Sequence, residues 1–375
     1  MRILVISDLP HFVVGGAEFQ AARLIEAWLD RGHEVICLGR RMRGDAVEIG
    51  RHRLRVGRIH VVQGLGRPGR ALSYFLSLAL LLLRHRRWPD VIYTRFLHEA
   101  AATAALLKQA GLLRCALVPT PANSGVNGDD KVIKALPFRH QLVRVLDAQC
   151  DAINLIAPAM ADDLRQLGFS GRGFSFIPNG IDLPDRVPRK AQARLRLLFV
   201  GRLAPQKGLD ILLSALARMA PALREKFELY LVGDGPERER LTDLAARHGL
   251  ADSIHFTGEV QQDRVQDLLL QSDIFVLPSR YEGMSNAALE AMAAGLPVLL
   301  TRCGGLDTYL NESSGWVVPP VDEMALAEAL ARAVATPREQ LSRMGQGARR
   351  IVEGNFAMAG IADRYLALFE SLRVR

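Results

Sequence analysis

The chain has 375 residues, of which 49% are hydrophobic and 23% are charged, and its net charge is +8. This length exceeds what one hydrophobic core usually supports and predicts two domains of about 150–200 residues each. The four cysteines are scattered without a Cys-x-x-Cys pair, which argues against a disulfide framework or zinc site and favours a reducing, cytosolic compartment.

The excess positive charge lies entirely in the first half. Residues 1–184 hold 24 Lys and Arg against 16 Asp and Glu, whereas residues 185–375 hold 24 of each. This asymmetry predicts an anionic partner for the first half. Because aromatic residues make up only 6% of the chain and do not interleave with a basic stripe, we expect no nucleic acid partner and favour an acidic membrane surface.

Short β-branched runs alternate with Ala- and Leu-rich segments along the chain. In the first half we expect strands at Ile3–Ser7, Glu34–Leu38, Ile59–Gln63, Val91–Thr94, Ala116–Pro119, Ala152–Ile156 and Ser175–Pro178, and helices at Ala17–Arg31, Ala71–Arg84 and Glu99–Gln109. In the second half we expect strands at Leu197–Gly201, Glu228–Gly233, Ile254–Thr257, Ile274–Leu277, Val298–Thr301 and Trp316–Val318, and helices at Leu209–Arg218, Glu237–Arg247, Ala287–Ala294 and Ala325–Ala335. Such alternation is typical of parallel sheets covered on both faces.

The pattern restarts after Leu183–Arg194, a proline- and charge-rich stretch that we expect to be a linker. The sequence therefore predicts an α/β protein with two doubly wound, Rossmann-like domains, residues 1–184 and 185–355, facing each other across a cleft. Ligands of such sheets bind outside the carboxyl ends of the strands. A last amphipathic helix, Ile361–Leu372, can pack on its own domain or return to the first one.

The expected helix around Leu72–Leu83 carries an apolar run and is followed by the basic segment Arg84–Arg87. The run is shorter than the roughly 20 residues that cross a bilayer. Two interpretations remain: a helix that lies in the membrane interface with its arginines on lipid head groups, or a core helix that ends in a solvated basic turn. The segment Lys131–Arg144 can add a second basic amphipathic face.

The Glu282–Glu290 run carries the strongest functional signal. It follows the expected strand Ile274–Leu277 and opens a helix that ends at Gly295. A helix N-terminus presents unpaired N–H groups that favour a phosphate group, whereas flanking carboxylates are suited to accept hydrogen bonds from sugar hydroxyls. A ligand that carries both groups, such as a nucleotide sugar, fits this run.

Two cations follow the first strand of the second half. Arg202 and Lys207 lie in a loop bounded by Gly201 and Gly208. The Arg fork and the Lys point charge suit a diphosphate leaving group, whose departure concentrates negative charge. Alone, the pattern is also typical of solvated surface cations; together with the Glu282–Glu290 run it indicates a donor site.

Two further glycine-rich segments lie between a strand and a helix. Gly15 and Gly16 allow close backbone approach and predict a second phosphate or donor contact, with a simple turn as the alternative. The segment Leu231–Pro236, which contains Gly233, is expected to line the nucleoside end of the donor site. Ile177–Asp182 closes the first domain and is expected to form a structural turn.

Together, these motifs resemble the retaining glycosyltransferases of GT-B architecture, specifically family 4 (group 1). The resemblance rests on Gly-Gly-Ala-Glu near the start, Pro-Asn-Gly-Ile-Asp at the domain boundary, Gly-Arg…Lys-Gly, Val-Gly-Asp-Gly-Pro and the Glu-x7-Glu run, in that order. It implies an N-terminal acceptor-side domain and a C-terminal nucleotide-sugar donor domain. It also implies that a helix over about residues 356–375 packs back onto the first domain.

The resemblance implies roles for matching residues. Arg202, Lys207 and Glu282 form the catalytic set, in which the two cations hold the donor diphosphate and Glu282 lies near the donor sugar. Glu290 binds the ribose hydroxyls. The remaining donor contacts come from the glycine-rich loops and the start of the helix, namely Gly15, Gly16, Gly201, Gly233, Gly283, Met284, Ser285 and Asn286.

Many family members place a histidine of the first domain close to the reacting sugar. Here Thr94–His98 and Val118–Asn123 occupy the comparable stretches, so His98 and Arg95 are the candidates for catalysis or acceptor binding. A purely structural histidine is the alternative, since a general acid or base must reach the reacting atom.

No Asp-x-Asp triplet occurs in the chain. Metal-dependent glycosyltransferases of the other major architecture use that triplet to hold a divalent ion. Since Arg202 and Lys207 can neutralise the diphosphate instead, we expect no metal and no cofactor apart from the nucleotide-sugar substrate.

The sequence therefore predicts a retaining, metal-independent hexosyltransferase that moves a sugar from a UDP- or GDP-sugar to a glycan acceptor. The basic first half favours a lipid-linked acceptor, as in envelope polysaccharide or lipopolysaccharide synthesis, and a cytoplasmic protein on the inner face of the plasma membrane. The rival interpretations are a nucleotide-sugar epimerase or a phosphorylase of the same architecture, and a non-catalytic scaffold that binds nucleotide sugars.

Overall fold

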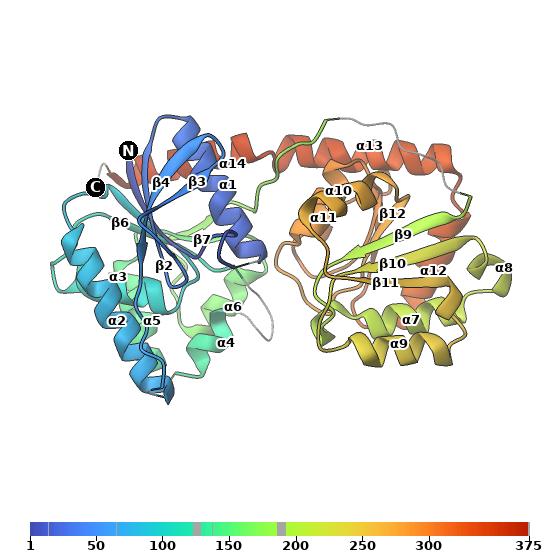
Figure 1. Ribbon diagram of the computed structural model, residues 1–375, viewed down its shortest axis with the longest axis horizontal. Coiled ribbons are helices and arrows are strands. Elements are labelled where there is room, and N and C mark those ends of the chain that lie inside the picture. The colour runs from blue at the N-terminus through green and yellow to red at the C-terminus, as the bar shows by residue number, and fades with distance from the viewer. Residues whose placement is uncertain (14, 65, 123–128, 137, 186–192, 374–375) are drawn as a thin grey trace. The chain divides into compact units, whose positions relative to one another are not determined.

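The computed structural model describes residues 1–13, 15–64, 66–122, 129–136, 138–185 and 193–373 (Figure 1). The chain divides into two compact units, which we call unit 1 (Met1–Gly180 with Met358–Arg375) and unit 2 (Ile181–Ala357). Most of the expected linker, residues 186–192, lies outside the described residues, as do residue 123 of the Val118–Asn123 stretch, residue 137 of the second basic segment and residues 374–375.

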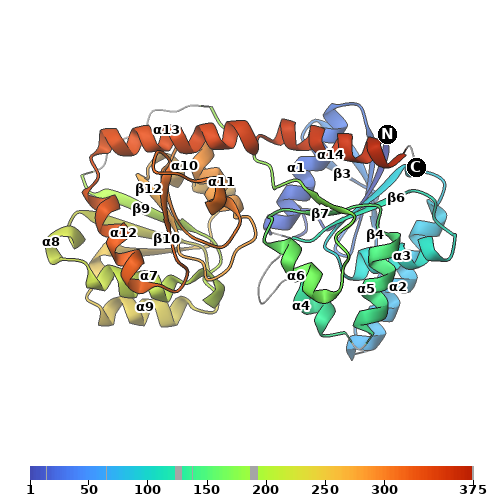
Figure 2. The same ribbon diagram turned by 180° about the vertical axis from the view of Figure 1, so that it is seen from behind.

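Unit 1 is built on a six-stranded sheet in the order β3-β4-β2-β1-β5-β6. Its strands are β1 (Arg2–Ile6), β2 (Glu34–Gly39), β3 (Ala46–Ile49), β4 (His52–Arg58), β5 (Val91–Arg95) and β6 (Ala116–Thr120), with β7 (Ile153–Leu155) and β8 (Phe174–Phe176) as a separate parallel pair. Its helices are α1 (Gly16–Asp30), α2 (Gly66–Arg84), α3 (Glu99–Gln109), α4 (Asp129–Lys134), α5 (Arg139–Gln149), α6 (Met160–Leu167) and α14 (Met358–Arg373). Helices α2, α3 and α5 pack as one group and α1 with α14 as another (Figures 1 and 2).

Every residue of β5 and β6 is buried, as expected for parallel strands with helices on both faces. The other strand pairs of this sheet are parallel too, except the antiparallel pair β3–β4 at its edge. The predicted α/β class is therefore confirmed for unit 1.

The expected strand at Ile59–Gln63 is wrong. These residues follow the strand β4, which pairs with β3 across a turn at Gly50 and Arg51. In β4 the buried Leu54 and Val56 alternate with exposed arginines, because this strand, which lies between the edge strand β3 and β2, buries only one face. The arginines lower the mean hydropathy of the segment and concealed this strand in the sequence.

Helix α14 contributes side chains to the core of unit 1. Tyr365 and Phe369 join Trp28 of α1 and Tyr93 of β5 in an aromatic cluster with ring centroids 5.5–6.4 Å apart. The Tyr365 hydroxyl accepts a hydrogen bond from the amide of Asn154 at 2.8 Å, so the polar end of this buried ring is satisfied. The cluster packs α14 against the sheet of unit 1, although Tyr365 and Tyr93 lie more than two hundred residues apart in the chain.

Unit 2 is built on a fully parallel sheet in the order β11-β10-β9-β12-β13-β14. Its strands are β9 (Leu195–Val200), β10 (Phe227–Val232), β11 (Ile254–Gly258), β12 (Ile274–Leu277), β13 (Val298–Thr301) and β14 (Gly315–Val318), and its helices are α7 (Leu209–Arg218), α8 (Pro221–Arg224), α9 (Arg238–Arg247), α10 (Gln262–Leu270), α11 (Asn286–Ala293), α12 (Glu323–Ala335) and α13 (Arg338–Asn355). Short 3₁₀ segments occur at Pro205–Lys207, Ala251–Ser253 and Leu306–Tyr309.

Helices α7, α9 and α12 cover one face of this sheet, and α10, α11 and α13 cover the other (Figures 1 and 2). The strand order, numbered along the unit as 3-2-1-4-5-6, is that of the dinucleotide-binding fold. The prediction of two Rossmann-like, doubly wound parallel sheets is thus confirmed. No helix in the described part of the chain is long and apolar enough to cross a membrane.

Replacing Phe369 by Ala should lower the free energy of unfolding of unit 1 by about 3–5 kcal/mol, because a fully buried ring leaves a cavity among the aromatic side chains. Urea unfolding followed by tryptophan fluorescence measures this, since Trp28 belongs to the cluster. Glu370→Gln, on the exposed face of the same helix, is the control and should change stability by less than about 0.5 kcal/mol. Equal stability of the two variants would contradict the packing role of α14.

Candidate active site

The strand order of unit 2 reverses between β9 and β12. These two strands are neighbours, with Ile274 opposite Leu197 and Phe275 opposite Leu198. Because the connections from the two strands lead away in opposite directions, the loops after them border a crevice at the carboxyl end of the sheet, where open α/β sheets bind ligands. The loop 201–208 after β9 and the loop 278–285 after β12 therefore meet there.

The two loops are joined by an ion pair. Lys207 Nζ lies 2.5 Å from Glu282 Oε2, and the side chains are 18% and 19% exposed. The hydroxyl of Ser279 also donates to Glu282, at 3.4 Å. An ammonium group has three donors, so Lys207 can bind Glu282 and still donate to further oxygens. The structure thus brings together two residues of the predicted catalytic set.

A second ion pair fixes the same loops and was missed in the sequence. Arg280 forms a two-pronged pair with Asp210 at 2.9 and 2.8 Å, and it also donates to the carbonyl of Pro205. Burial opposes the ionisation of Asp210, but the hydrogen bonds and charge of Arg280 outweigh it and lower the pKa of Asp210. This pair holds the Pro205–Lys207 turn against the loop after β12.

Gly208 allows the Pro205–Lys207 turn to end close to the loop after β12. Its φ is +63°, and a Cβ atom there would lie 2.2 Å from the carbonyl oxygen of Pro278. A side chain at this position would push the two loops apart. The glycine therefore determines how closely Lys207 approaches Glu282.

Arg202 lies between Gly201 and Leu203 with an exposed side chain. Within the described residues, no ion pair is recorded for its guanidinium group. The backbone N–H of Gly201 donates to the carbonyl of Val232, and that of Gly233 donates to Gly258, so the ends of β9, β10 and β11 are held together. Arg202 is thus a cation at the rim of the crevice, presented by a fixed backbone.

Helix α11 starts directly beside this cation pair. Ser285 is its N-cap, with the hydroxyl accepting from the N–H of Ala288 at 3.3 Å. The preceding Gly283 and Met284 are buried, and Asn286 is the first residue of the helix. Since the N-terminus of a helix carries partial positive charge, it adds to the two cations in favouring an anion.

Glu290 lies about one turn further along α11 than Asn286. The side chain of Gln262 donates to its carboxylate at 3.4 Å. The geometry therefore places Glu282 before the helix and Glu290 within it, as the spacing predicts. Neither carboxylate takes part in a metal-ligating group, and no cluster of three or more His, Cys, Asp or Glu suited to a metal ion occurs among the described residues.

Unit 1 has a corresponding reversal between β1 and β5, and a cavity of about 260 Å³ lies there. Its lining mixes acids, bases and aromatics; the polar members are Ser7, Asp8, Glu18, Arg40, Arg41, Tyr74, Arg95, His98 and Glu99. Gly15 is the N-cap of α1 and Gly16 its first residue, which places both near the same end of the sheet. Burial, with Asp8 adding to it, raises the pKa of Glu18.

The two first-domain candidates differ in their surroundings. Arg95 is 2% exposed and donates to the side chain of Asn179 at 2.9 Å and to the hydroxyl of Tyr93 at 3.3 Å. It links β5 to the Pro-Asn-Gly-Ile-Asp segment, a contact that the sequence did not predict. Two of its five N–H donors thus bind groups in the interior of unit 1, and its buried Nε has no hydrogen-bond partner.

His98 is more accessible, with 27% of its side chain exposed. Its Nε2 lies 3.7 Å from the buried carboxylate of Asp129, and its ring stacks on Phe96, whose φ of +85° is unusual for a residue with a side chain. Sparsely populated backbone conformations of this kind are frequent at functional sites. An imidazole oriented by a carboxylate and facing a cavity is suited to proton transfer.

The sequence was compared with known families and proteins. The pattern of "Glycosyltransferase Family 4" matches residues 14–184, and that of "Glycosyl transferases group 1" matches residues 184–351. This chain belongs to the group 1 (family 4) glycosyltransferases. The two matches meet at residue 184 and together cover nearly the whole chain.

Individual relatives of this glycosyltransferase include a D-inositol 3-phosphate glycosyltransferase of Streptomyces griseus. It is 31% identical over 334 residues, which span 80% of this chain and 67% of that protein. A putative colanic acid biosynthesis glycosyltransferase, WcaL, of Escherichia coli K12 is 28% identical over 293 residues, or 76% of this chain and 71% of that protein.

Solved structures share the fold. A sucrose-phosphate synthase from Thermosynechococcus elongatus superimposes with a TM-score of 0.81 at 25% identity and covers 99% of this chain and 98% of that one. The Anabaena protein HepE in complex with UDP-glucose gives a TM-score of 0.77 at 19% identity, over 99% of this chain and 100% of that one. The GT-B architecture of this glycosyltransferase is thereby established.

Replacing Asp210 by Asn should destabilise unit 2 at neutral pH by about 1 kcal/mol, the size of a partly exposed ion pair. Since the folded-state pKa of Asp210 is lowered from 3.8, its contribution is complete above that value and disappears as the pH falls below it. Wild type and variant should therefore differ in urea midpoint at pH 7 and converge as the pH falls through the lowered pKa of Asp210. Asp243→Asn, an exposed carboxylate on α9, is the control; a difference that persists in acid would contradict the assignment.

Proposed function

We propose that this glycosyltransferase moves a sugar from a nucleotide diphosphate sugar to a glycan acceptor, without a metal ion and with retention of anomeric configuration. In this proposal unit 2 binds the donor and the cavity of unit 1 binds the acceptor. The observation that carries it is the Lys207–Glu282 pair beside the start of α11, at the reversal of the strand order.

The local charges support a diphosphate in this crevice. Lys207 and Arg202 supply two cations, and the first N–H groups of α11 supply a partial positive charge. Glu282 holds the ammonium group of Lys207 in place, so little reorganisation is needed when negative charge develops on the leaving phosphate. The carboxylate of Glu290 is suited to accept hydrogen bonds from the ribose hydroxyls.

Structural neighbours support a nucleotide-sugar donor. HepE was solved with UDP-glucose, and a further neighbour, with a TM-score of 0.76 at 15% identity, was solved with UDP-2-fluoro glucose bound. We extend this by fold alone to a UDP- or GDP-sugar as the donor of the present enzyme. The cation pair takes the place that a divalent ion has in metal-dependent enzymes.

The reaction then needs few protein groups. The bond between the anomeric carbon and the β-phosphate oxygen breaks, and the acceptor hydroxyl forms the new glycosidic bond. The departing phosphate, held by Arg202 and Lys207, accepts the proton of that hydroxyl. Because attack and departure occur on the same face of the sugar, configuration is retained without a covalent intermediate.

The acceptor cavity suits a hydroxyl-rich molecule. Its acids (Asp8, Glu18) and its bases (Arg40, His98) can accept from and donate to sugar hydroxyls, respectively. The sequence relative WcaL is named for colanic acid biosynthesis, and this likeness favours, as the acceptor of the present enzyme, an envelope glycan carried on a lipid at the inner face of the plasma membrane. We propose this class of acceptor.

Replacing Lys207 or Arg202 by Ala should lower kcat/KM for sugar transfer by about 10²–10³-fold, because each substitution removes a cation that stabilises the leaving phosphate. Radiolabelled-sugar transfer, with a panel of UDP- and GDP-sugars tested first by calorimetry, measures the effect. Lys226→Ala removes an exposed charge elsewhere in unit 2 and is the matched control. Unchanged transfer in both active-site variants would refute the proposal, and donor binding without any product would favour a scaffold.

Replacing His98 by Ala should lower kcat for transfer at least about tenfold, because the imidazole lines the acceptor cavity and its loss misplaces the acceptor hydroxyl that the leaving phosphate deprotonates. Donor affinity in calorimetry should stay within about twofold, because His98 belongs to unit 1. His140→Ala, an exposed histidine of α5, is the control and should transfer normally. Full activity of the His98 variant would assign this residue a structural role.

A further inference from the structure

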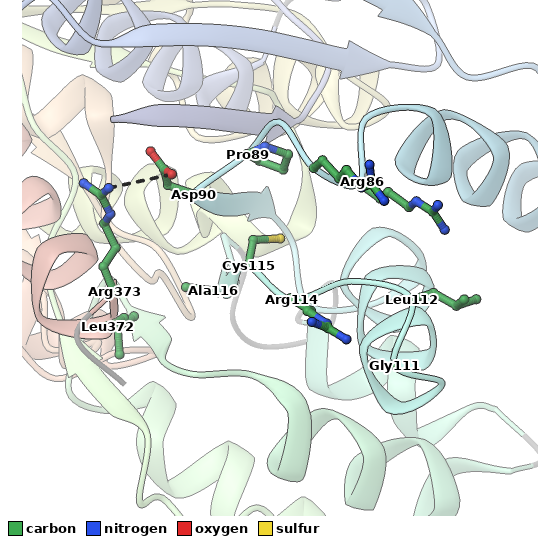
Figure 3. A pocket seen from close by; sticks show the side chains of 11 residues that line it. Arg86, Pro89, Asp90, Gly111, Leu112, Arg114, Cys115, Ala116, Leu372 and Arg373 are labelled. Atoms are coloured by element: carbon green, nitrogen blue, oxygen red, sulfur yellow. Dashed lines mark ion pairs between the residues drawn. The ribbon is translucent and has the colours of Figure 1, made fainter.

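A second, larger cavity of about 640 Å³ lies in unit 1, at the opposite end of the sheet from the acceptor cavity. Asp90 precedes β5 and Ala116 begins β6, so the cavity opens at the amino ends of these parallel strands (Figure 3). Its lining consists of Arg86, Arg87, Pro89, Asp90, Gly111, Leu112, Arg114, Cys115, Ala116, Leu372 and Arg373. We call it the arginine cavity.

The arginine cavity is strongly cationic. It contains four arginines and one carboxylate, Asp90, which is already paired with Arg2 at 3.3 Å and with Arg373 at 3.8 Å. Arg86, Arg87 and Arg114 are exposed, and no ion pair is recorded for them within the described residues. Guanidinium groups that converge on a cavity are suited to bind phosphate in a forked geometry.

Helix α2, which leads into this cavity, has two apolar faces. Tyr74, Leu78 and Leu82 are buried against the core at 6%, 0% and 1% exposure, so the interpretation as a core helix holds for one face. Leu72, Leu76 and Leu80 are 58%, 51% and 69% exposed, so the run Leu72–Leu83 is only in part a core segment. The interpretation as a core helix is thus confirmed for one face only, and the interpretation as a membrane-interface helix stays a prediction for the opposite face.

The exposed leucines form a stripe that runs toward the arginines. Leu72, Leu76 and Leu80 are spaced by four residues and span about 12 Å along α2. The next position of this row is Arg84, and the turn after it supplies Arg86 and Arg87 to the cavity. At the other side of the cavity the exposed Leu112 lies beside Arg114 (Figure 3). Apolar and cationic groups therefore form one continuous surface.

Charge and composition indicate which partner covers this surface. A second copy of the chain, packed through the same face, would bring two sets of arginines together. A nucleic acid duplex would leave the exposed leucines uncovered, and a single strand would need aromatic side chains on which its bases stack. A membrane with acidic lipids can cover both the leucines and the arginines, because leucines enter the boundary between head groups and acyl chains while arginines bind the lipid phosphates.

We propose that the leucine stripe of α2 and the arginine cavity dock unit 1 on an acidic membrane, with a phospholipid phosphate bound by Arg86, Arg87 and Arg114. The inference rests on the proposed function only for its choice of the membrane that carries the acceptor. It assigns the cavity to lipid binding rather than to donor or acceptor binding. The arginine cavity lies at the other end of the sheet from His98, so lipid binding by its arginines and sugar transfer can be tested separately.

Flotation of the full chain with vesicles tests the proposal. Wild type should bind vesicles of phosphatidylcholine with 30% phosphatidylglycerol about tenfold or more tightly than pure phosphatidylcholine vesicles, and less tightly at high salt. The triple variant Arg86→Gln, Arg87→Gln, Arg114→Gln should lose this preference. The triple variant Arg247→Gln, Arg343→Gln, Arg350→Gln, which removes the same charge from exposed positions of unit 2, should bind like wild type.

A third variant, Leu72→Ser, Leu76→Ser, Leu80→Ser, should bind acidic vesicles only at low salt, since its electrostatic part remains. Calorimetry with the donor nucleotide sugar should give wild-type affinity for all three variants, so a failure of docking is distinguishable from a failure of the proposed transfer. Absence of wild-type binding to acidic vesicles, or equal loss in the unit 2 control, would overturn the proposal. A leucine variant that floats normally but changes from dimer to monomer would instead assign the stripe to self-association.

Discussion

The reversal of strand order in each parallel sheet is the constraint on which the candidate sites depend. Where neighbouring strands lead to connections that run in opposite directions, the loops after them border a crevice at the carboxyl end of the sheet. In unit 2 this brings Lys207 and Glu282 together, although 75 residues separate them in the chain. In unit 1 the same arrangement places the segment after β1 beside His98.

The charges around the donor crevice serve two different purposes. Arg280 and Asp210 pair with each other and with the loop backbone, so they determine the shape of the loop rather than its affinity for a ligand. Lys207 is held by one carboxylate and retains further donors, while Arg202 lies exposed at the rim. Fixed cations of this kind stabilise a developing negative charge with little reorganisation, which is where electrostatic catalysis gains most.

Unit 1 carries two cavities of different character at opposite ends of its parallel strands. At the carboxyl ends of its strands a smaller cavity mixes acids and bases, as hydroxyl-rich ligands require. At the amino ends the arginine cavity is almost purely cationic and continues into exposed leucines. Part of the excess positive charge of the first half thus lies in this cavity, at Arg86, Arg87 and Arg114.

The sequence by itself determined the two-domain α/β class, nearly all the buried strands, and the donor-site residues Arg202, Lys207, Glu282 and Glu290 as candidates, because these depend on local periodicity and on short motifs. It missed the β3–β4 pair, because the arginines of β4 resemble a loop, and it missed helices such as α10 and α13, of which α13 contains glycines that lower helix propensity. One of them, Gly345, allows α13 to approach the backbone of Gly295, where a Cβ atom would lie 1.8 Å from its carbonyl oxygen.

Only the tertiary structure decided which residues are partners. The Arg280–Asp210 and Arg95–Asn179 contacts, the carboxylate beside His98, and the buried and exposed faces of α2 all depend on elements far apart in the chain. Local patterns specify what each segment can form, since helix and strand periods are read over a few residues. Which side chain meets which is determined by strand order and packing, and these are properties of the whole sheet.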